Sequence, residues 1–174
     1  MTQPRIAVVG GGIAGLSLAL NLHQRGMACD VYESVPEVRE LGVGITLLPH
    51  AMRELAALGL QPALEAVGIE NLESVFFNRH GQFVYREARG RHAGYALPEL
   101  GIHRGKLHRI LFEAALERLG RERVHTGRRV SGLSQDAEGV TLRFEPTPAG
   151  QPEPVRAEWV VACDGVNSAV RRHF

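Results

Sequence analysis

The 174-residue sequence has only two cysteines, no long apolar run and almost no net charge. Cys29 and Cys163 are too few for a disulfide scaffold, so two reduced core thiols are expected, although the sequence leaves a disulfide between them open. The apolar stretches are of strand length, and the N-terminus lacks the regions of a signal peptide. A formal net charge of +1 offers no electrostatic footprint for nucleic acid or an anionic membrane. We therefore expect a cytoplasmic protein without nucleic-acid or membrane partners.

Two kinds of catalytic signal are missing as well. The eight histidines include no H-E-x-x-H motif and no paired His/Cys spacing, so no metal site is expected. No serine lies in a G-x-S-x-G elbow, which argues against a hydrolase. The length and the apolar fraction of 44% are those of a globular chain that can bury a core.

The first 34 residues have the pattern of a strand, a helix and a second strand. RIAVVG, residues 5–10, is a short β-branched run that ends in glycine. Residues 14–26 are rich in Leu and Ala and close on Gly26, the usual end of a helix. ACDVYES, residues 28–34, reads as the second strand. A βαβ unit predicts an α/β fold with a parallel sheet and a right-handed crossover.

The rest of the chain predicts two further helices, a hairpin and a meander. PHAMRELAALGL starts a helix at Pro49, and GKLHRILFEAALERLG is the most amphipathic helix of the sequence. Residues 72–88 form two strand-like runs around N-R-H-G, which predicts an antiparallel hairpin. Three strands of a meander are expected at 123–136, 139–146 and 155–163, with a Pro-rich loop before the last.

The glycine-rich turn after the first strand fits G-x-G-x-x-G at a strand-to-helix junction. Gly10 permits the tight turn, Gly12 lets a pyrophosphate approach the backbone, and Gly15 allows close helix packing. Ile13 and Ala14 open the helix whose N-terminus faces the anion. Glu33, at the end of the second strand, can accept hydrogen bonds from an adenosine ribose, and uncharged Ser34 follows it. The unit is predicted to bind an adenine dinucleotide, either FAD or NAD; the alternative is a glycine turn that serves packing alone.

Three separated stretches resemble the FAD-dependent aromatic-ring monooxygenases, the family of p-hydroxybenzoate and salicylate hydroxylases. The first is the glycine loop with its acid, and the second is HRGKLHRIL, in which the family's flavin-contacting arginine falls on Arg104. The third is CDGVNSAVRRHF, which places Asp164 and Gly165 on the family's Asp-Gly motif. ELGVGITL, with Gly44, is similar to the Gly-rich segment near the flavin ring, and it looks particularly like the salicylate and phenazine hydroxylases.

The resemblance implies a fold, a cofactor and an activity. The fold is a Rossmann-like FAD-binding fold, with the glycine-loop βαβ unit, a β-meander and an inserted antiparallel hairpin. Residues 1–70 and 99–174 would form the FAD-binding domain and 71–98 the start of the substrate-domain sheet. The activity would be hydroxylation of a small aromatic or heteroaromatic compound with molecular oxygen and NAD(P)H, through a C4a-hydroperoxyflavin. No residue is assigned as catalytic.

The family continues into a second Gly-Asp motif that this sequence lacks, so we expect an incomplete, N-terminal part that is not competent alone. The hairpin edge, with Phe76, Phe77 and Phe83, would then favour self-association.

Simpler interpretations stay open at this point. Arg104 could only cap a helix, Asp164 and Gly165 could form an ordinary turn, and Arg39 and Arg171 could be surface charges. The parent protein could also be a flavin-dependent epoxidase or reductase, an NAD-binding dehydrogenase, or a non-catalytic dinucleotide-binding module or partner subunit.

Overall fold

The computed structural model describes residues 6–37 and 42–173, and the chain divides into two compact units. One unit comprises Met1–Arg39 and Leu111–Phe174, and the other comprises Glu40–Ile110. The division falls within helix α4 (Arg104–Leu119). The functional boundaries proposed from the sequence, with a substrate part at 71–98, stay a prediction.

The first unit is built on a four-stranded parallel sheet in the order β12-β1-β2-β8. Its strands are β1 (Ile6–Val9), β2 (Cys29–Tyr32), β8 (Val124–His125) and β12 (Trp159–Ala162). Helix α1 (Ile13–Gln24) connects β1 to β2, as the βαβ pattern predicts. Val9 pairs with both Tyr32 and Ala162, so the three strands end level with one another. The segments that follow them therefore begin at one edge of the sheet.

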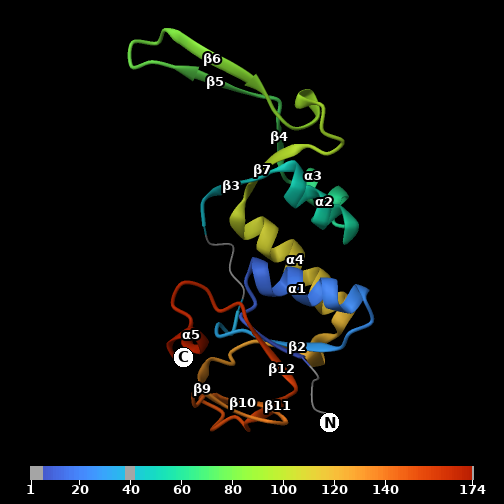
Figure 1. Ribbon diagram of the computed structural model, residues 1–174, viewed down its shortest axis with the longest axis vertical. Helices are drawn as coiled ribbons and strands as arrows, with labels where there is room; N and C mark the ends of the chain where they lie inside the picture. The colour runs from blue at the N-terminus through green and yellow to red at the C-terminus, as the bar shows by residue number, and fades with distance from the viewer. Residues whose placement is uncertain (1–5, 38–41, 174) are drawn as a thin grey trace. The chain divides into compact units, whose positions relative to one another are not determined.

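An antiparallel meander packs against this sheet, on the side away from α1 (Figure 1). It consists of β9 (Val130–Asp136), β10 (Gly139–Phe144) and β11 (Val155–Ala157). The shared core holds Ala7 and Val9 of the sheet together with Leu142 and Phe144 of the meander. Burial of these apolar side chains is the main force that joins the two layers. The short helices η2 (Arg121–Arg123) and α5 (Ala169–His173) complete the unit.

Two of the strands predicted for the meander are each divided between two sheets. Residues 155–163 form β11 in the meander and then, beyond Glu158, β12 in the parallel sheet. Residues 123–136 likewise form β8 in the parallel sheet before β9 begins. The prediction of single strands was wrong here, because an apolar pattern indicates a strand and does not identify the partner with which it pairs.

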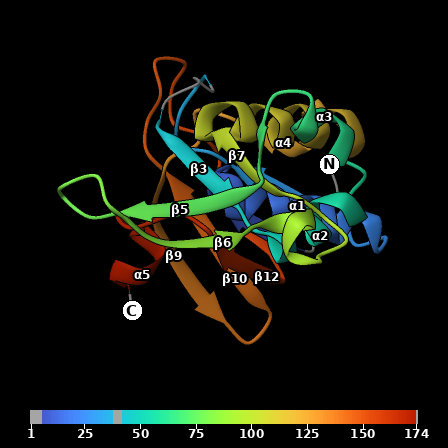
Figure 2. The same cartoon turned by 90° about the horizontal axis from the view of Figure 1, so that it is seen from above.

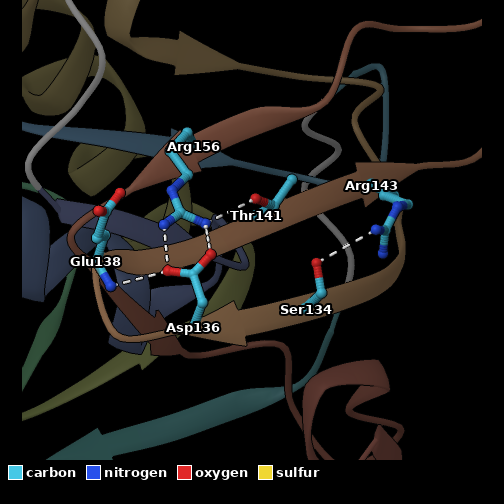
Figure 3. Close-up of polar contacts among 6 residues, drawn as sticks. All are labelled: Ser134, Asp136, Glu138, Thr141, Arg143 and Arg156. Atoms are coloured by element: carbon cyan, nitrogen blue, oxygen red, sulfur yellow. Dashed lines mark hydrogen bonds and ion pairs between the residues drawn. The ribbon is translucent and has the colours of Figure 1, made fainter.

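Polar contacts tie the three meander strands together on the exposed face. Arg156 of β11 donates from Nη1 to Asp136 Oδ2 (2.8 Å) and to Thr141 Oγ1 (3.2 Å), and its other terminal nitrogen also contacts the Asp136 carboxylate (Figure 3). Arg143 donates to the hydroxyl of Ser134 at 3.2 Å. The hydrogen bonds from Arg156 lower the pKa of Asp136 to about 2.

The second unit contains a three-stranded antiparallel sheet that was not expected from the sequence. Its order is β3-β7-β4, and the strands are β3 (Gly44–Leu47), β7 (Glu99–His103) and β4 (Ile69–Asn71). Helices α2 (Pro49–Ala57) and α3 (Gln61–Glu65) and the 3-10 helix η1 (Gly90–Ala93) belong to the same unit. α2 begins at Pro49, as predicted.

The predicted hairpin is confirmed as β5 (Glu73–Phe77) and β6 (Phe83–Ala88), and it projects from the rest of its unit (Figure 2). Asn78 stabilises its turn, because its side-chain oxygen accepts hydrogen bonds from the N–H groups of His80 (2.9 Å) and Gln82 (3.0 Å). Phe77 and Phe83 are 60% and 59% exposed. The tip of the hairpin therefore presents exposed apolar side chains to solvent.

The helices of residues 6–37 and 42–173 are all too short or too polar to cross a bilayer. Within the same ranges, no three His, Cys, Asp or Glu side chains are grouped so as to hold a metal ion.

Candidate functional site

The turn after β1 is held against two neighbouring strands. Gly10 donates its N–H to the carbonyl of Tyr32 at 2.8 Å, and its φ of +105° is one that other residues rarely adopt. A Cβ at Gly10 would also lie 2.7 Å from the carbonyl carbon of Cys163 and closer still to its oxygen. Only glycine therefore allows β1 to turn this close to the segment after β12.

The next two glycines of the motif have different surroundings. A Cβ on Gly12, the N-cap residue of α1, would meet no atom within 4 Å, so the backbone there faces open space. A Cβ on Gly15 would lie 3.1 Å from the carbonyl carbon of Gly10 and closer to its oxygen. Gly15 thus serves the packing of α1 against the turn, whereas Gly12 leaves the helix N-terminus accessible. Ile13 and Ala14, which lie between these two glycines in the sequence, are the first two residues of α1.

Glu33 follows β2, and both oxygens of its carboxylate accept hydrogen bonds. Its Oε2 accepts the N–H of Gly11 at 2.6 Å, and its Oε1 accepts the Ser34 hydroxyl (3.0 Å) and the Val35 N–H (2.9 Å). A carboxylate offers about four lone-pair positions. Three hydrogen bonds therefore orient Glu33 and leave capacity for a further donor.

The Asp-Gly pair follows β12 and begins the turn into α5. Asp164 Oδ2 accepts the N–H groups of Ala169 (2.7 Å) and Val170 (3.2 Å), and Gly165 has a φ of +73°. Burial acts to raise the pKa of Asp164, but hydrogen bonds from the Ser168 hydroxyl and the backbone hold it below its usual value. In the described part of the chain its Oδ1 is buried and has no hydrogen-bond partner. An acceptor in this situation is suited to a donor from a ligand or a water.

These three stretches line one cavity of about 330 Å³ in the first unit. Six of the residues predicted to bind a cofactor contribute to it: Gly10, Gly12, Glu33, Ser34, Asp164 and Gly165. The cavity also has cationic side chains, from Arg128, Arg129 and Arg172. An anionic ligand with hydroxyl groups would find open backbone at a helix N-terminus, carboxylate acceptors and compensating positive charge.

Comparison with known proteins agrees with this geometry. Residues 3–174 match the family described as the FAD binding domain. The chain belongs to this family. The glycine loop left FAD and NAD open as the dinucleotide. Membership of this family decides in favour of FAD.

Relatives of this FAD-binding domain include aromatic hydroxylases. The phenazine 1,6-dicarboxylic acid hydroxylase PhzS of Lysobacter antibioticus is 40% identical over 172 residues, which cover 98% of this chain and 42% of that protein. The 6-hydroxynicotinate 3-monooxygenase of Pseudomonas fluorescens is 32% identical over 177 residues, 99% of this chain and 43% of that protein. The crystal structure of a Klebsiella pneumoniae HpxO variant complexed with FAD has a TM-score of 0.77 at 30% identity, with 98% and 42% of the two chains covered. The chain spans about two-fifths of the length of these relatives.

Several residues of the site were missed from the sequence. Arg128 and Arg129 lie in the connection from β8 to β9, and Arg172 lies in α5. The sequence predicted one strand over 123–136 with both arginines inside it, and their position at this edge depends on the pairing of β8 with β2. Arg171, which the sequence left open as a surface charge, donates from its guanidinium to the Val166 carbonyl at 2.6 Å.

Cys163 also lines the cavity, where its surroundings disfavour the thiolate. Burial, together with the charge of Asp164, raises the pKa of its thiol, which favours the neutral form. Cys163 and Cys29 are both free thiols. The chemistry of the site is thus that of binding and orientation by backbone, carboxylates and cations.

The remaining predicted residues of this FAD-binding domain belong to the second unit. Arg104 is exposed and is the first residue of α4, where its N–H donates to the Val43 carbonyl at 3.0 Å. Gly42 has a φ of +135°, and a Cβ there would lie 3.2 Å from the Arg104 Cβ. Gly44 is exposed, with open space where a Cβ would stand. Arg39 lies outside the described residues. The flavin-contacting roles of Arg104 and Gly44 stay predictions.

Proposed function

We propose that this chain is the FAD-binding part of an NAD(P)H-dependent monooxygenase that hydroxylates a small aromatic or heteroaromatic compound. One observation carries the proposal: a single cavity is lined by the glycine loop, the acid after β2 and the Asp-Gly turn after β12. The names of the relatives, among them a phenazine dicarboxylic acid hydroxylase and a hydroxynicotinate monooxygenase, support the substrate class. NAD(P)H as reductant and a C4a-hydroperoxyflavin as the oxygen-transferring species belong to the same proposal.

The cavity fits the adenosine diphosphate half of FAD. Gly12 would let the pyrophosphate reach the N-terminus of α1, where unpaired N–H groups and the helix dipole favour an anion. Glu33 has acceptor capacity left for ribose hydroxyls, and Asp164 has a buried oxygen suited to a hydroxyl donor. The flavin would supply hydride and oxygen chemistry, while the chain's residues bind and orient it.

Binding is tested first, with a matched pair of acidic residues. Glu33→Gln removes one charged acceptor at the cavity, whereas Glu117→Gln changes an exposed glutamate on α4. A hydrogen bond to a charged group contributes about 1.5–3 kcal/mol, so E33Q should weaken FAD binding about 10- to 100-fold. E117Q should bind FAD as the wild type does. Equal affinity of wild type and E33Q in calorimetric titration would refute the assigned role of Glu33.

Activity is tested on the complete protein expressed from its gene. Aromatic carboxylic acids and hydroxypyridines are added with NADH or NADPH under labelled oxygen, and the products are analysed by mass spectrometry. Incorporation of one labelled oxygen atom supports the monooxygenase. NAD(P)H oxidation without oxygen incorporation would favour a reductase, and FAD binding without any oxidation would favour a non-catalytic binding module.

A further inference from the structure

A histidine ring in the second unit connects the start of α4 to the segment that leads into β3. His103, the last residue of β7, lies immediately before α4, and its Nδ1 is 3.2 Å from the backbone nitrogen of Gly105. Its Nε2 is 3.1 Å from the carbonyl oxygen of Gly42. A carbonyl can only accept a hydrogen bond, and a backbone N–H can only donate one. The neutral ring must therefore carry its proton on Nε2 and accept through Nδ1.

The contact with Gly105 is a helix N-cap. The first four N–H groups of a helix have no partner within the helix, and a side-chain acceptor just before the helix binds the second or third residue's N–H. Gly105 is the second residue of α4 and is buried, so water cannot readily replace this acceptor. His103 thus supplies the acceptor that Ser or Asp provides at many other helices.

The contact with Gly42 completes a ladder between two stretches of backbone. Gly44 is paired with His103, and the Val43 carbonyl accepts the N–H of Arg104 at 3.0 Å. The ring adds a third link, one residue farther back, at Gly42. A Cβ at Gly42 would lie 3.2 Å from Arg104 Cβ, so the two backbones are already close. His103 therefore holds these two stretches together.

Protonation of the ring would affect its two contacts differently. An imidazolium still donates from Nε2, so the bond to Gly42 would remain, but its Nδ1 has no lone pair for Gly105. The ring would also place a positive charge at the N-terminus of α4, where the helix dipole disfavours a cation. The first turn of α4 contains no acidic residue and already has the cations Arg104 and Lys106.

The carboxylates near β7 have partners other than His103. Among residues 6–37 and 42–173, no ion pair involves His103. Residues 42–47 contain no ionisable side chain. The other ionisable residues of β7, and those of β4, α2 and η1 that pack against it, are His50, Arg53, Glu54, Glu70, Arg91, His92 and Glu99. Glu54 pairs with Arg53, Glu70 pairs with Arg91, and Glu99 accepts a hydrogen bond from Asn71, so none of these acids compensates a charged ring.

We propose that His103 is a positioning residue that joins the first turn of α4 to residues 42–44, and that protonation of its ring releases α4 alone. With the neutral ring both contacts are closed. At acidic pH the cap opens and the end of α4 that carries Arg104 loosens, while Gly42 stays bound to the ring. None of these contacts involves a cofactor, so their test is separate from that of the proposed function.

Two variants of the complete protein separate the contacts in amide hydrogen exchange measured by mass spectrometry. In His103→Asn the side-chain oxygen takes the place of Nδ1, so the cap is kept and the bond to Gly42 is lost. In His103→Gln the side-chain nitrogen reaches as far as Nε2, so the bond to Gly42 is kept and the cap is lost. His50→Gln, at an exposed histidine in the first turn of α2, is the control.

The expected exchange differs between the two segments. At about pH 7.5, H103Q should exchange about 2- to 30-fold faster than wild type at the start of α4, the effect of a lost N-cap on an opening equilibrium. H103N should exchange about 2- to 10-fold faster over residues 42–47, the effect of one lost hydrogen bond. Each variant should match the wild type at the other segment, and H50Q should match it at both. At about pH 5 the wild type should exchange about 2- to 30-fold faster than H103N at the start of α4, because Asn does not titrate.

Three results would overturn the proposal. One is an equal effect of H103N and H103Q on both segments, and another is equal protection of wild type and H103N at the start of α4 in acid. The third comes from NMR of nitrogen-labelled histidine in the wild-type protein, which decides even where a variant does not fold. A His103 ring that carries its proton on Nδ1 at neutral pH would contradict the assigned contacts, whereas a proton on Nε2, joined by one on Nδ1 in acid, would support them.

Discussion

Substitution of Gly15 by alanine tests whether α1 is packed against the glycine turn as closely as the structure indicates. The added Cβ would lie 3.1 Å from the carbonyl carbon of Gly10, closer to its oxygen, and 3.3 Å from Cys163 Cβ. The obstructing atoms belong to the backbone and cannot rotate away. α1 must therefore shift, and its buried contacts through Leu16 and Leu20 must shift with it.

The size of the effect follows from two opposing contributions. Overpacking of a well-packed site costs about 1–3 kcal/mol. Alanine is favoured over glycine in a helix by up to about 1 kcal/mol, which offsets part of this cost. A net loss of about 1–2 kcal/mol remains in the free energy of unfolding. For a chain of this length, each kcal/mol lowers the melting temperature by about 2–4 °C, so G15A should melt roughly 2–8 °C lower.

The assay is thermal unfolding without FAD, with Gly12→Ala as the matched control. A Cβ on Gly12 meets no atom within 4 Å, so G12A should lose about 1 kcal/mol or less, the cost of alanine at an N-cap. For FAD binding, G12A rather than G15A should show the larger loss, because Gly12 lines the cavity and Gly15 does not. G12A should weaken FAD binding about 10- to 100-fold through loss of a charge-assisted hydrogen bond. Equal melting temperatures of G15A and wild type, or stronger destabilisation in G12A, would refute this account of the loop.

Three further predictions concern other parts of the chain. Asp164→Asn should destabilise the protein at neutral pH. Burial raises the pKa of Asp164, but the hydrogen bonds lower it by more, so its pKa in the folded protein is depressed. A depressed folded pKa contributes stability that is fully present above the unfolded pKa of about 4. The difference from wild type should vanish as the pH falls through the lower folded pKa, and a pH-independent difference in denaturant unfolding would contradict this. Arg156→Met should raise the pKa of Asp136 from about 2 toward the ordinary range, as followed by NMR titration; an unchanged pKa would assign the depression to the backbone N–H groups instead. Phe83→Glu at the exposed hairpin tip should reduce concentration-dependent self-association of the 174-residue chain in sedimentation experiments, and identical sedimentation of the two would contradict the predicted edge contact.

Local features of the fold could be predicted from the sequence, and non-local pairings could not. The βαβ unit, the hairpin and the helix from Pro49 each follow from a pattern within about 30 residues. The assignment of residues 155–163 to two sheets depends on β12 lying beside β1, whose paired residues are 153 positions earlier in the chain. The β3-β7-β4 sheet joins strands separated by more than 20 residues on each side, and no local pattern specifies such partners.

The candidate site divides in the same way. Gly10, Gly12 and Glu33 could be chosen from their positions around one strand–helix–strand unit. Arg104 and Gly44 came from the resemblance alone. Arg128 lies in a connection and Arg172 in the short helix α5, and the placement of both follows from strand pairing, so no local pattern distinguishes them from other arginines. Cations on loops are the site residues most easily missed from sequence, because charged side chains are common on any protein surface.

The pairing of β12 with β1 explains why two motifs far apart in the chain form one site. Val9 and Ala162 are paired, so the next residues along each strand, Gly10 and Cys163, emerge side by side. Cys163 donates its N–H to the Val9 carbonyl at 2.7 Å, which extends the ladder by one step beyond the strands. At this step the two backbones are so close that only glycine fits at position 10. The first glycine of the loop therefore has two functions: it turns the chain toward α1, and it admits the segment that carries Asp164. A side chain at position 10 would separate the Asp-Gly turn from the glycine loop, even where the rest of G-x-G-x-x-G was preserved.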